Sequence, residues 1–243
     1  GARCDLLSVD YSYGFSEEVQ QEWTWSEQFA PQPEILAYAN FVADRLKLRQ
    51  HYRFNTRVES ATWDEARQLW VVRTNDGKLL EATYCVMSTG PLSKPTDPDI
   101  PGLGRFKGQT LRAARWPQEE PDLKGKRVGV LGTGSSGMQI IQTLGRTDCE
   151  LFVFQRTPSF TLPMRNRKVS ERDVAELKAN YASIRAACRL NPTGGARPVS
   201  TRPFFSIPAD HRQELMEQAW QHGGHTFLGI FSDLMVNQSA NDQ

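Results

Sequence analysis

The residues with the most definite chemistry form a glycine-rich turn. They are the three glycines of a G-x-G-x-x-G motif, Gly132, Gly134 and Gly137. Apolar runs at 128–131 and 150–154 and a helical pattern at 135–144 place the motif between a strand and a helix. There the first glycine permits a tight bend, the second lets a pyrophosphate approach the backbone, and the third lets the helix pack closely. The residues predicted to bind a dinucleotide are Gly132, Thr133, Gly134, Ser135, Ser136 and Gly137, the alternative being a plain glycine-rich surface turn.

The end of the second strand indicates which dinucleotide binds. An NAD site usually places Asp or Glu there, to accept a hydrogen bond from the ribose 2′-hydroxyl. This chain has Gln155-Arg156-Thr157 instead, with no carboxylate to repel a 2′-phosphate. A guanidinium can hold a phosphate through two parallel hydrogen bonds, and a hydroxyl can add a third. Arg156 and Thr157 therefore predict NADPH as the ligand.

Composition bounds the class of protein. The chain has 243 residues, enough for one large or two small domains, with 39% hydrophobic and 23% charged residues. A net charge of +1 gives no strong attraction to nucleic acid or to an anionic membrane. No apolar run approaches the roughly 20 residues that span a bilayer. We expect a soluble protein that binds neither nucleic acid nor membrane.

The cysteines and histidines predict no metal site. Cys4, Cys85, Cys149 and Cys188 are widely spaced, and the four histidines form no metal-ligand pattern with them. Scattered cysteines of this kind are typical of reduced thiols in the cytosol. No basic-then-apolar signal segment opens the chain. We therefore expect a cytoplasmic location.

Elsewhere the pattern predicts mixed α/β structure. Residues 1–30 read as a long ordered loop, and Pro33 suits the first position of a helix. Period-two patterns predict an antiparallel meander of strands at 57–63, 70–74 and 79–84, with a hairpin turn at Asn75-Asp76-Gly77. An apolar strand is predicted at 85–90, where its glycine turn could hold a cofactor against backbone or be a plain turn.

The second half of the chain is predicted to be helical around two loops. A capping-box pattern at 170–173 starts a helix to about 190, and another helix is expected at 209–222. The basic loop at 165–168 reads as a solvated loop in preference to a phosphate contact. The predicted domain bounds are 1–94, 95–162 (linker and partial NADP-binding Rossmann) and 163–243 (helical).

The predicted dinucleotide half is short of strands. Such a half normally needs three parallel strands, and only helical patterns and proline-rich loops follow Thr157. We expect the chain to be a fragment cut at both ends, poorly stable and inactive alone.

Essentially the whole chain resembles the middle of a flavin-dependent Baeyer–Villiger monooxygenase. Gly-Ala-Arg-Cys-Asp at 1–5, Tyr-Ser-Tyr-Gly-Phe-Ser at 11–16, Gln-Glu-Trp at 21–23 and Gln-Pro-Glu-Ile at 32–35 resemble the family's flavin domain. Met-Ser-Thr-Gly at 87–90 with Leu92-Ser93 resembles the strand end that joins the flavin and NADP domains. The glycine motif with Gln139, and Phe-Gln-Arg-Thr-Pro at 154–158, resemble the family's NADP site.

The resemblance implies an α/β flavoprotein with two dinucleotide-binding domains, here as a Rossmann-type NADP half with a helical insertion and part of the FAD domain. That partial FAD-binding domain is residues 1–94 and includes the antiparallel meander. It implies FAD and NADPH as cofactors, and a peroxyflavin that inserts one oxygen atom from O2 beside a ketone carbonyl. Asp5 matches the acid beside the flavin, which would hold a catalytic arginine that this chain does not contain. The further residues implied in cofactor binding are Arg3, Cys4, Tyr11, Val58, Thr89, Gly90 and Gln139.

One position departs from the family fingerprint F-x-G-x-x-x-H-x-x-x-W-P. Phe106, Gly108, Trp116 and Pro117 are in register, but Arg112 replaces the histidine. Histidine changes charge near neutral pH, whereas arginine stays cationic and only donates. Arg112, which we include with Asp5 in the catalytic set, either locks one arrangement by pairing with a carboxylate or a phosphate, or is a harmless solvated replacement.

Other functions stay open at this point. A related flavin monooxygenase could oxidise amines or sulfides at nitrogen or sulfur with the same two cofactors. A non-catalytic NADP-binding remnant is a second alternative. A structural interaction domain is a third, supported only by the aromatic residues within 1–30.

Overall fold

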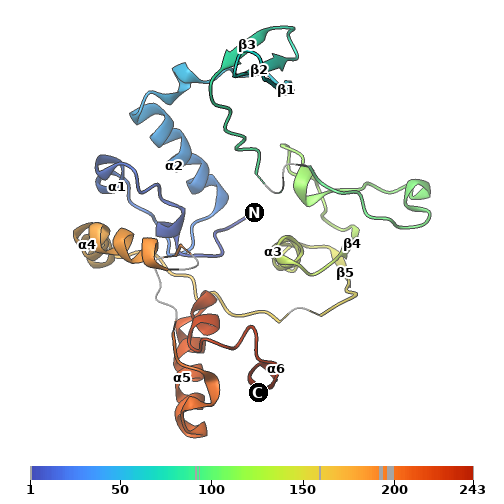
Figure 1. Ribbon diagram of the computed structural model, residues 1–243. Helices are drawn as coiled ribbons and strands as arrows, with labels where there is room; N and C mark the ends of the chain where they lie inside the picture. The colour runs from blue at the N-terminus through green and yellow to red at the C-terminus, as the bar shows by residue number, and fades with distance from the viewer. Residues whose placement is uncertain are drawn as a thin grey trace. The chain divides into compact units, whose positions relative to one another are not determined.

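The computed structural model describes residues 2–90, 92, 94–158, 160–191, 194–195 and 200–242. These residues form two compact units, one of 1–46 with 122–243 and the other of 47–121 (Figure 1). The packing therefore does not follow the domain bounds expected at 94/95 and 162/163. Those bounds concern the cofactor domains of the intact protein and stay a prediction.

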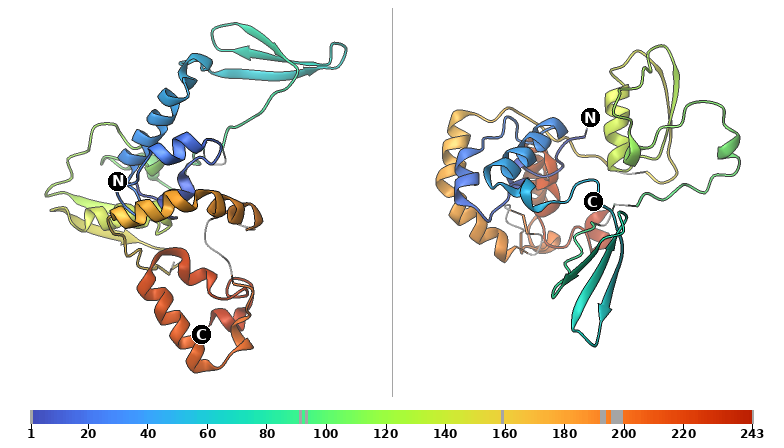
Figure 2. Two further views of the ribbon diagram at one scale, coloured as in Figure 1. Left: turned by 90° about the vertical axis from the view of Figure 1, so that its left-hand side faces the viewer. Right: turned by 90° about the horizontal axis from the view of Figure 1, so that it is seen from above.

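The unit of residues 47–121 contains the predicted meander. Strands β1 (Val58–Asp64), β2 (Leu69–Thr74) and β3 (Leu79–Ala82) form an antiparallel sheet in the order β1-β2-β3 (Figure 2). Trp63 lies opposite Trp70 across the ladder, with ring centroids 5.7 Å apart. Gly77 closes the β2–β3 hairpin with a φ of 79°. Three short 3-10 helices complete the unit: η2 (Leu48–His51), η3 (Leu103–Arg105) and η4 (Ala113–Arg115).

The strand predicted at 85–90 is wrong. The segment has no regular secondary structure, no described strand pairs with it, and Val86 and Met87 are 86% and 63% exposed. A strand exists only where its backbone groups find hydrogen-bond partners, so an apolar sequence alone does not make one. Ser93, which resembles the domain-joining segment, lies outside the described residues.

The strand–turn–helix–strand prediction is confirmed in the other unit. Strands β4 (Arg127–Leu131) and β5 (Glu150–Phe154) pair in parallel, with helix α3 (Ser135–Leu144) between them in the chain. The Gly132 amide donates to the Phe154 carbonyl at 2.8 Å, which carries the pairing into the glycine turn. The turn is thereby fixed at the carboxyl edge of both strands, where α/β proteins place their ligands.

The opening segment of the same unit forms a small aromatic core. It contains η1 (Ser8–Tyr11), α1 (Glu17–Glu22) and α2 (Gln32–Arg45). Val19, Phe29 and Val42 are each at most 2% exposed. Trp25 is 4% exposed, and its indole nitrogen donates to the Ser12 hydroxyl at 2.9 Å. The order predicted for this segment is thus confirmed over residues 2–30, but the prediction of a loop missed helix α1.

Helix α4 (Glu171–Leu190) attaches to this opening segment. Its predicted capping box is present, with Ser170 and Asp173 each accepting the other's backbone N–H. Further along, Arg185 donates to the Gln20 side chain at 2.9 Å and to the Ser12 carbonyl at 3.0 Å. A Cβ at Gly14 would lie 3.1 Å from the Arg185 guanidine nitrogen. The absence of a side chain at Gly14 therefore leaves room for this arginine.

The last part of the chain packs on its own cluster. Helix α5 (Ala209–His222) ends at Gly223, whose φ is 80°, and is followed by η6 (Gly224–Gly229) and α6 (Gln238–Asn241). With η5 (Phe204–Ser206), these elements bury Phe204, Phe231, Leu234 and Ala240. No helix in the described part of the chain is both long enough and apolar enough to cross a membrane.

The glycine turn yields a stability prediction. A Cβ at Gly137 would overlap the carbonyl oxygen of Gly132, a backbone atom that cannot move away cheaply. Gly137→Ala should therefore destabilise the intact protein by about 1–3 kcal/mol, the usual cost of overpacking. Gly134→Ala is the matched control, since Gly134 has a φ of −70° and no atom within 4 Å of an added Cβ. Urea denaturation of both variants measures the difference, and equal stabilities would contradict the packing argument.

Candidate functional site

The glycine turn and the end of β5 enclose one open pocket. Its volume is about 730 Å³. Its lining contains three of the six predicted turn residues and both predicted strand-end residues: Leu131, Gly132, Thr133, Gly134, Val153, Phe154, Gln155, Arg156 and Thr157. The structure therefore brings the two halves of the predicted dinucleotide site together.

The backbone of the turn fits a pyrophosphate. Gly132 has a φ of 95°, a left-handed conformation that favours glycine. Gly134, the N-cap of α3, has open space where a side chain would stand, which leaves its backbone approachable. Ser135, Ser136 and Gly137 are the first three residues of α3, so their N–H groups lack intrahelical partners. The helix dipole adds positive potential there, and no acidic residue lies in the first turn to oppose an anion.

The end of β5 offers a cation beside the turn. Arg156 and Thr157 are exposed, and within the described ranges Arg156 has neither an ion-pair partner nor a hydrogen-bond partner. Gln155 donates from Nε2 to the Thr133 hydroxyl at 2.8 Å, which ties the strand end to the turn. The guanidinium is thus free to bind an anion without first breaking an internal contact.

Asp5 and Tyr11 form an exposed acid–phenol pair in the opening segment. The Tyr11 hydroxyl donates to Asp5 Oδ1 at 2.5 Å. Burial and the Asp5 carboxylate raise the pKa of Tyr11 to about 12, so the phenol keeps its proton at neutral pH. One carboxylate oxygen is therefore oriented by Tyr11, and the other is left to accept from a different donor.

Arg3 and Cys4 use their side chains within the fold. Cys4 is 3% exposed, and burial raises the pKa of its thiol. The Arg3 guanidinium pairs with the Glu27 carboxylate and donates to the Phe29 carbonyl at 2.7 Å. Cofactor contacts by Arg3 and Cys4 stay predictions.

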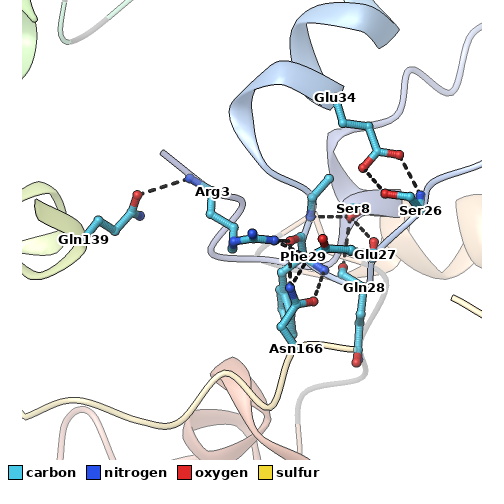
Figure 3. A network of polar contacts seen from close by, with 10 residues as sticks. Arg3, Ser8, Ser26, Glu27, Gln28, Phe29, Glu34, Gln139 and Asn166 are labelled. Atoms are coloured by element: carbon cyan, nitrogen blue, oxygen red, sulfur yellow. Dashed lines mark hydrogen bonds and ion pairs between the residues drawn. The ribbon is translucent and has the colours of Figure 1, made fainter. Parts of the chain in front are cut away.

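The sequence analysis missed a hydrogen-bonded group around Phe29, which we call the Asn166 clasp (Arg3, Glu27, Phe29 and Asn166). The Phe29 amide donates to Asn166 Oδ1 at 3.0 Å, and Asn166 Nδ2 donates to the Glu27 carboxylate (Figure 3). Asn166 belongs to the basic segment interpreted as a solvated loop; it is exposed, as that interpretation expects, but it also bonds to distant residues. Its partners lie more than 130 residues away, a distance over which local patterns carry no signal.

Arg167, in the same basic segment, also has an internal partner. Its guanidinium pairs with the Asp173 carboxylate at 2.7 Å, at the start of α4. This ion pair holds the pKa of Asp173 well below its usual range. Arg167 and Asn166 are both exposed, which agrees with a solvated loop, and both side chains also have internal partners.

The remaining flavin candidates lie in the unit of 47–121. Val58 starts β1 beside an irregularity in the ladder and is 57% exposed. Thr89 and Gly90 are exposed, and Gly90 has the φ of 70° expected for a turn. The predicted flavin residues are thus divided between the two units.

No group of three His, Cys, Asp or Glu side chains in the described residues could hold a metal ion.

The fingerprint segment has two clear local contacts. The Phe106 ring lies over the backbone of Gly108, where any Cβ would overlap it, which explains the glycine of the F-x-G start. Arg112, in the histidine position, forms an ion pair with Asp97. The Arg112 side chain is 33% exposed and that of Asp97 is 71% exposed. The cation is thus paired with a carboxylate, one of the arrangements expected from the sequence.

Comparison with known proteins gives the family. The family model of flavin-binding monooxygenase-like proteins matches residues 21–173. Over 99% of its own length, the chain is 39% identical to phenazine N-monooxygenase PhzNO1 of Lysobacter antibioticus. Over 100% of its own length, it is 37% identical to a Baeyer–Villiger monooxygenase of Pseudooceanicola batsensis. It covers 45% of each, so it spans about half the length of the curated relatives that it matches.

The solved structures agree with the sequence relatives. An oxidised steroid monooxygenase bound to NADP superposes with a TM-score of 0.92 at 44% identity, over 100% of this chain and 46% of that chain. This likeness confirms the predicted α/β flavoprotein fold. The chain belongs to the flavin-binding monooxygenase-like family.

Proposed function

We propose that the intact protein is a FAD- and NADPH-dependent monooxygenase that inserts one oxygen atom beside a ketone carbonyl. The observation that carries the proposal is the pocket in which an open glycine turn faces Arg156 and Thr157 with no carboxylate at the strand end. The similarity to a named Baeyer–Villiger monooxygenase supports the oxidation of ketones. The four cysteines are all free, which supports a cytoplasmic location.

The proposed reaction balances as ketone + O2 + NADPH + H⁺ → ester or lactone + H2O + NADP⁺. NADPH supplies a hydride, and bound FAD supplies the two-electron chemistry that activates O2. The residues of this chain bind and orient. The N–H groups at the start of α3 would hold the pyrophosphate, and Arg156 with Thr157 would hold the 2′-phosphate.

Asp5 is the residue proposed to act beside the flavin. Its carboxylate is exposed and oriented by Tyr11, so one oxygen remains to accept from a guanidinium. A carboxylate beside an arginine stays ionised and fixes the guanidinium's position. Arg112 is proposed as a positioning residue, since its contact is with Asp97 in the fingerprint segment. Arg3, Cys4, Tyr11, Val58, Thr89 and Gly90 are proposed to line the flavin site.

Product analysis tests the proposal against its alternative. The similarity to a phenazine N-monooxygenase makes nitrogen oxygenation the specific competitor. Purified intact protein with FAD, NADPH and O2 is given cyclohexanone, phenazine or a tertiary amine, and the products are identified by mass spectrometry. A lactone from the ketone supports the proposal, whereas an N-oxide without lactone overturns it in favour of the alternative. If no product forms and no NADPH is consumed, the result would indicate a non-catalytic remnant.

Arg156 should determine the choice of nicotinamide cofactor. Loss of a charge-assisted bidentate contact costs about 1.5–3 kcal/mol, so Arg156→Ala should weaken NADPH binding about tenfold to hundredfold. NADH lacks the 2′-phosphate, and its affinity should stay nearly unchanged. Titration of both cofactors measures the effect, with Arg146→Ala as an exposed control in the same unit. Equal losses for NADPH and NADH would exclude a 2′-phosphate contact.

The ion pair of Arg112 should affect the coupling of NADPH use to oxygenation. Arg112→His should raise the ratio of oxygenated product to NADPH consumed, since it replaces a fixed, paired cation. Asp97→Asn breaks the same pair from the other side and should act in the same direction. Because an exposed ion pair contributes at most about 1 kcal/mol, we expect at most about a fivefold change. An unchanged ratio in both variants would show that the pair does not influence coupling.

A further inference from the structure

A side chain of the phosphate-binding helix reaches the segment that carries Asp5. The Arg3 amide N–H donates to Gln139 Oε1 at 3.1 Å (Figure 3). Gln139 lies in α3, one turn after the start of the helix, and is half-buried. The two residues are 136 positions apart, so this contact fixes a long-range arrangement.

The backbone around Arg3 explains why its amide needs this acceptor. Ala2 accepts from the Gln32 amide at 2.8 Å, and the Cys4 amide donates to the Ala30 carbonyl at 2.9 Å. Arg3 therefore forms a one-residue antiparallel bridge with Pro31. In an antiparallel pairing the intervening residue directs its N–H to the opposite side, away from the paired strand. Gln139 satisfies this outward N–H.

The Asn166 clasp holds the same residue by its side chain. The Arg3 guanidinium pairs with Glu27 and donates to the Phe29 carbonyl at 2.7 Å. With its side chain and both neighbouring residues fixed, the direction of the Arg3 amide is fixed as well. The position of Gln139, and hence of α3, is then set relative to the backbone two residues before Asp5.

We propose that Gln139 is a positioning residue that joins the phosphate-binding helix to the Asp5 segment, and not a direct ligand of the cofactor. The inference rests on the proposed function for its catalytic consequence, but the contact itself does not. Through Gln139 and Arg3, NADPH bound at the start of α3 and the acid beside the flavin keep a fixed relative position. Hydride transfer depends on that relative position, because small displacements of reacting groups slow a reaction strongly.

The chemistry of the side chain separates the two roles of Gln139. The observed contact needs an acceptor, which glutamate retains and leucine, of similar size, lacks. A direct contact to a cofactor phosphate would need the amide N–H donor, which both variants lack. Glutamate would in addition repel the phosphate. Gln139→Glu should therefore resemble the native protein in a positioning role, and should be the worse variant in a ligand role.

The first measurement is hydrogen–deuterium exchange of the Arg3 amide in the intact protein. In Gln139→Leu the amide loses its acceptor and should exchange about 2- to 10-fold faster, the factor that corresponds to one ordinary hydrogen bond. Gln139→Glu should keep the native rate. Gln142→Leu is the matched control, an exposed glutamine of the same helix. An Arg3 exchange rate unchanged in Gln139→Leu overturns the proposal.

The second measurement separates binding from chemistry in the same variants. For Gln139→Leu we expect an NADP⁺ dissociation constant within twofold of native and a flavin reduction rate at saturating NADPH that is several-fold lower, with Gln139→Glu restoring the rate. NADP⁺ affinity at least tenfold weaker in Gln139→Glu than in Gln139→Leu overturns the positioning role in favour of a phosphate ligand. If the native protein binds no NADP⁺, the proposed function fails, while the exchange experiment still decides the Arg3–Gln139 contact.

Discussion

The candidate site depends on the close approach of α3 to the end of β4. The carbonyl of Gly132 occupies the space in which a side chain at Gly137 would begin, so helix and turn can meet only with a hydrogen at that position. This approach brings three N–H groups that lack intrahelical partners to the edge of the two strands. It also sets Thr133 near enough to Gln155 for a 2.8 Å hydrogen bond. Without it, Arg156 and the turn would not share one pocket.

A second set of contacts ties this pocket to the rest of its unit. The Asn166 clasp and the Arg3–Gln139 hydrogen bond connect residues near the start of the chain to α3 and to the segment after β5. Arg185 of α4 adds a further link to the loop around Ser12. Each link is a polar contact between segments distant in the chain. Together they restrict how far the glycine turn with α3 and the Asp5 segment can move apart.

The limits of sequence reasoning follow from the range of the interactions. Helix α3 and the capping box of α4 were predictable because each depends on residues within one or two helical turns, and the two parallel strands because the glycine motif between them indicates their pairing. The segment at 85–90 has the composition of a strand, yet strand formation also needs a partner, which composition does not reveal. The same limit applies to Asn166. A single asparagine among basic residues is typical of a loop, and only the distant Phe29 amide makes it structural.

The same distinction separates recognition from catalysis at this site. Phosphate recognition needs unpaired donors, and these come from local features: a glycine turn, a helix start and the free guanidinium of Arg156. Alignment of a nicotinamide with a flavin needs two segments held at a fixed separation, which only long-range contacts provide. A chain could therefore keep its cofactor motif intact and still lose its activity through one substitution far from the motif in sequence. In this protein Gln139 is connected to both requirements. It lies on α3, whose start is proposed to bind the phosphates, and it bonds to the segment of the proposed acid.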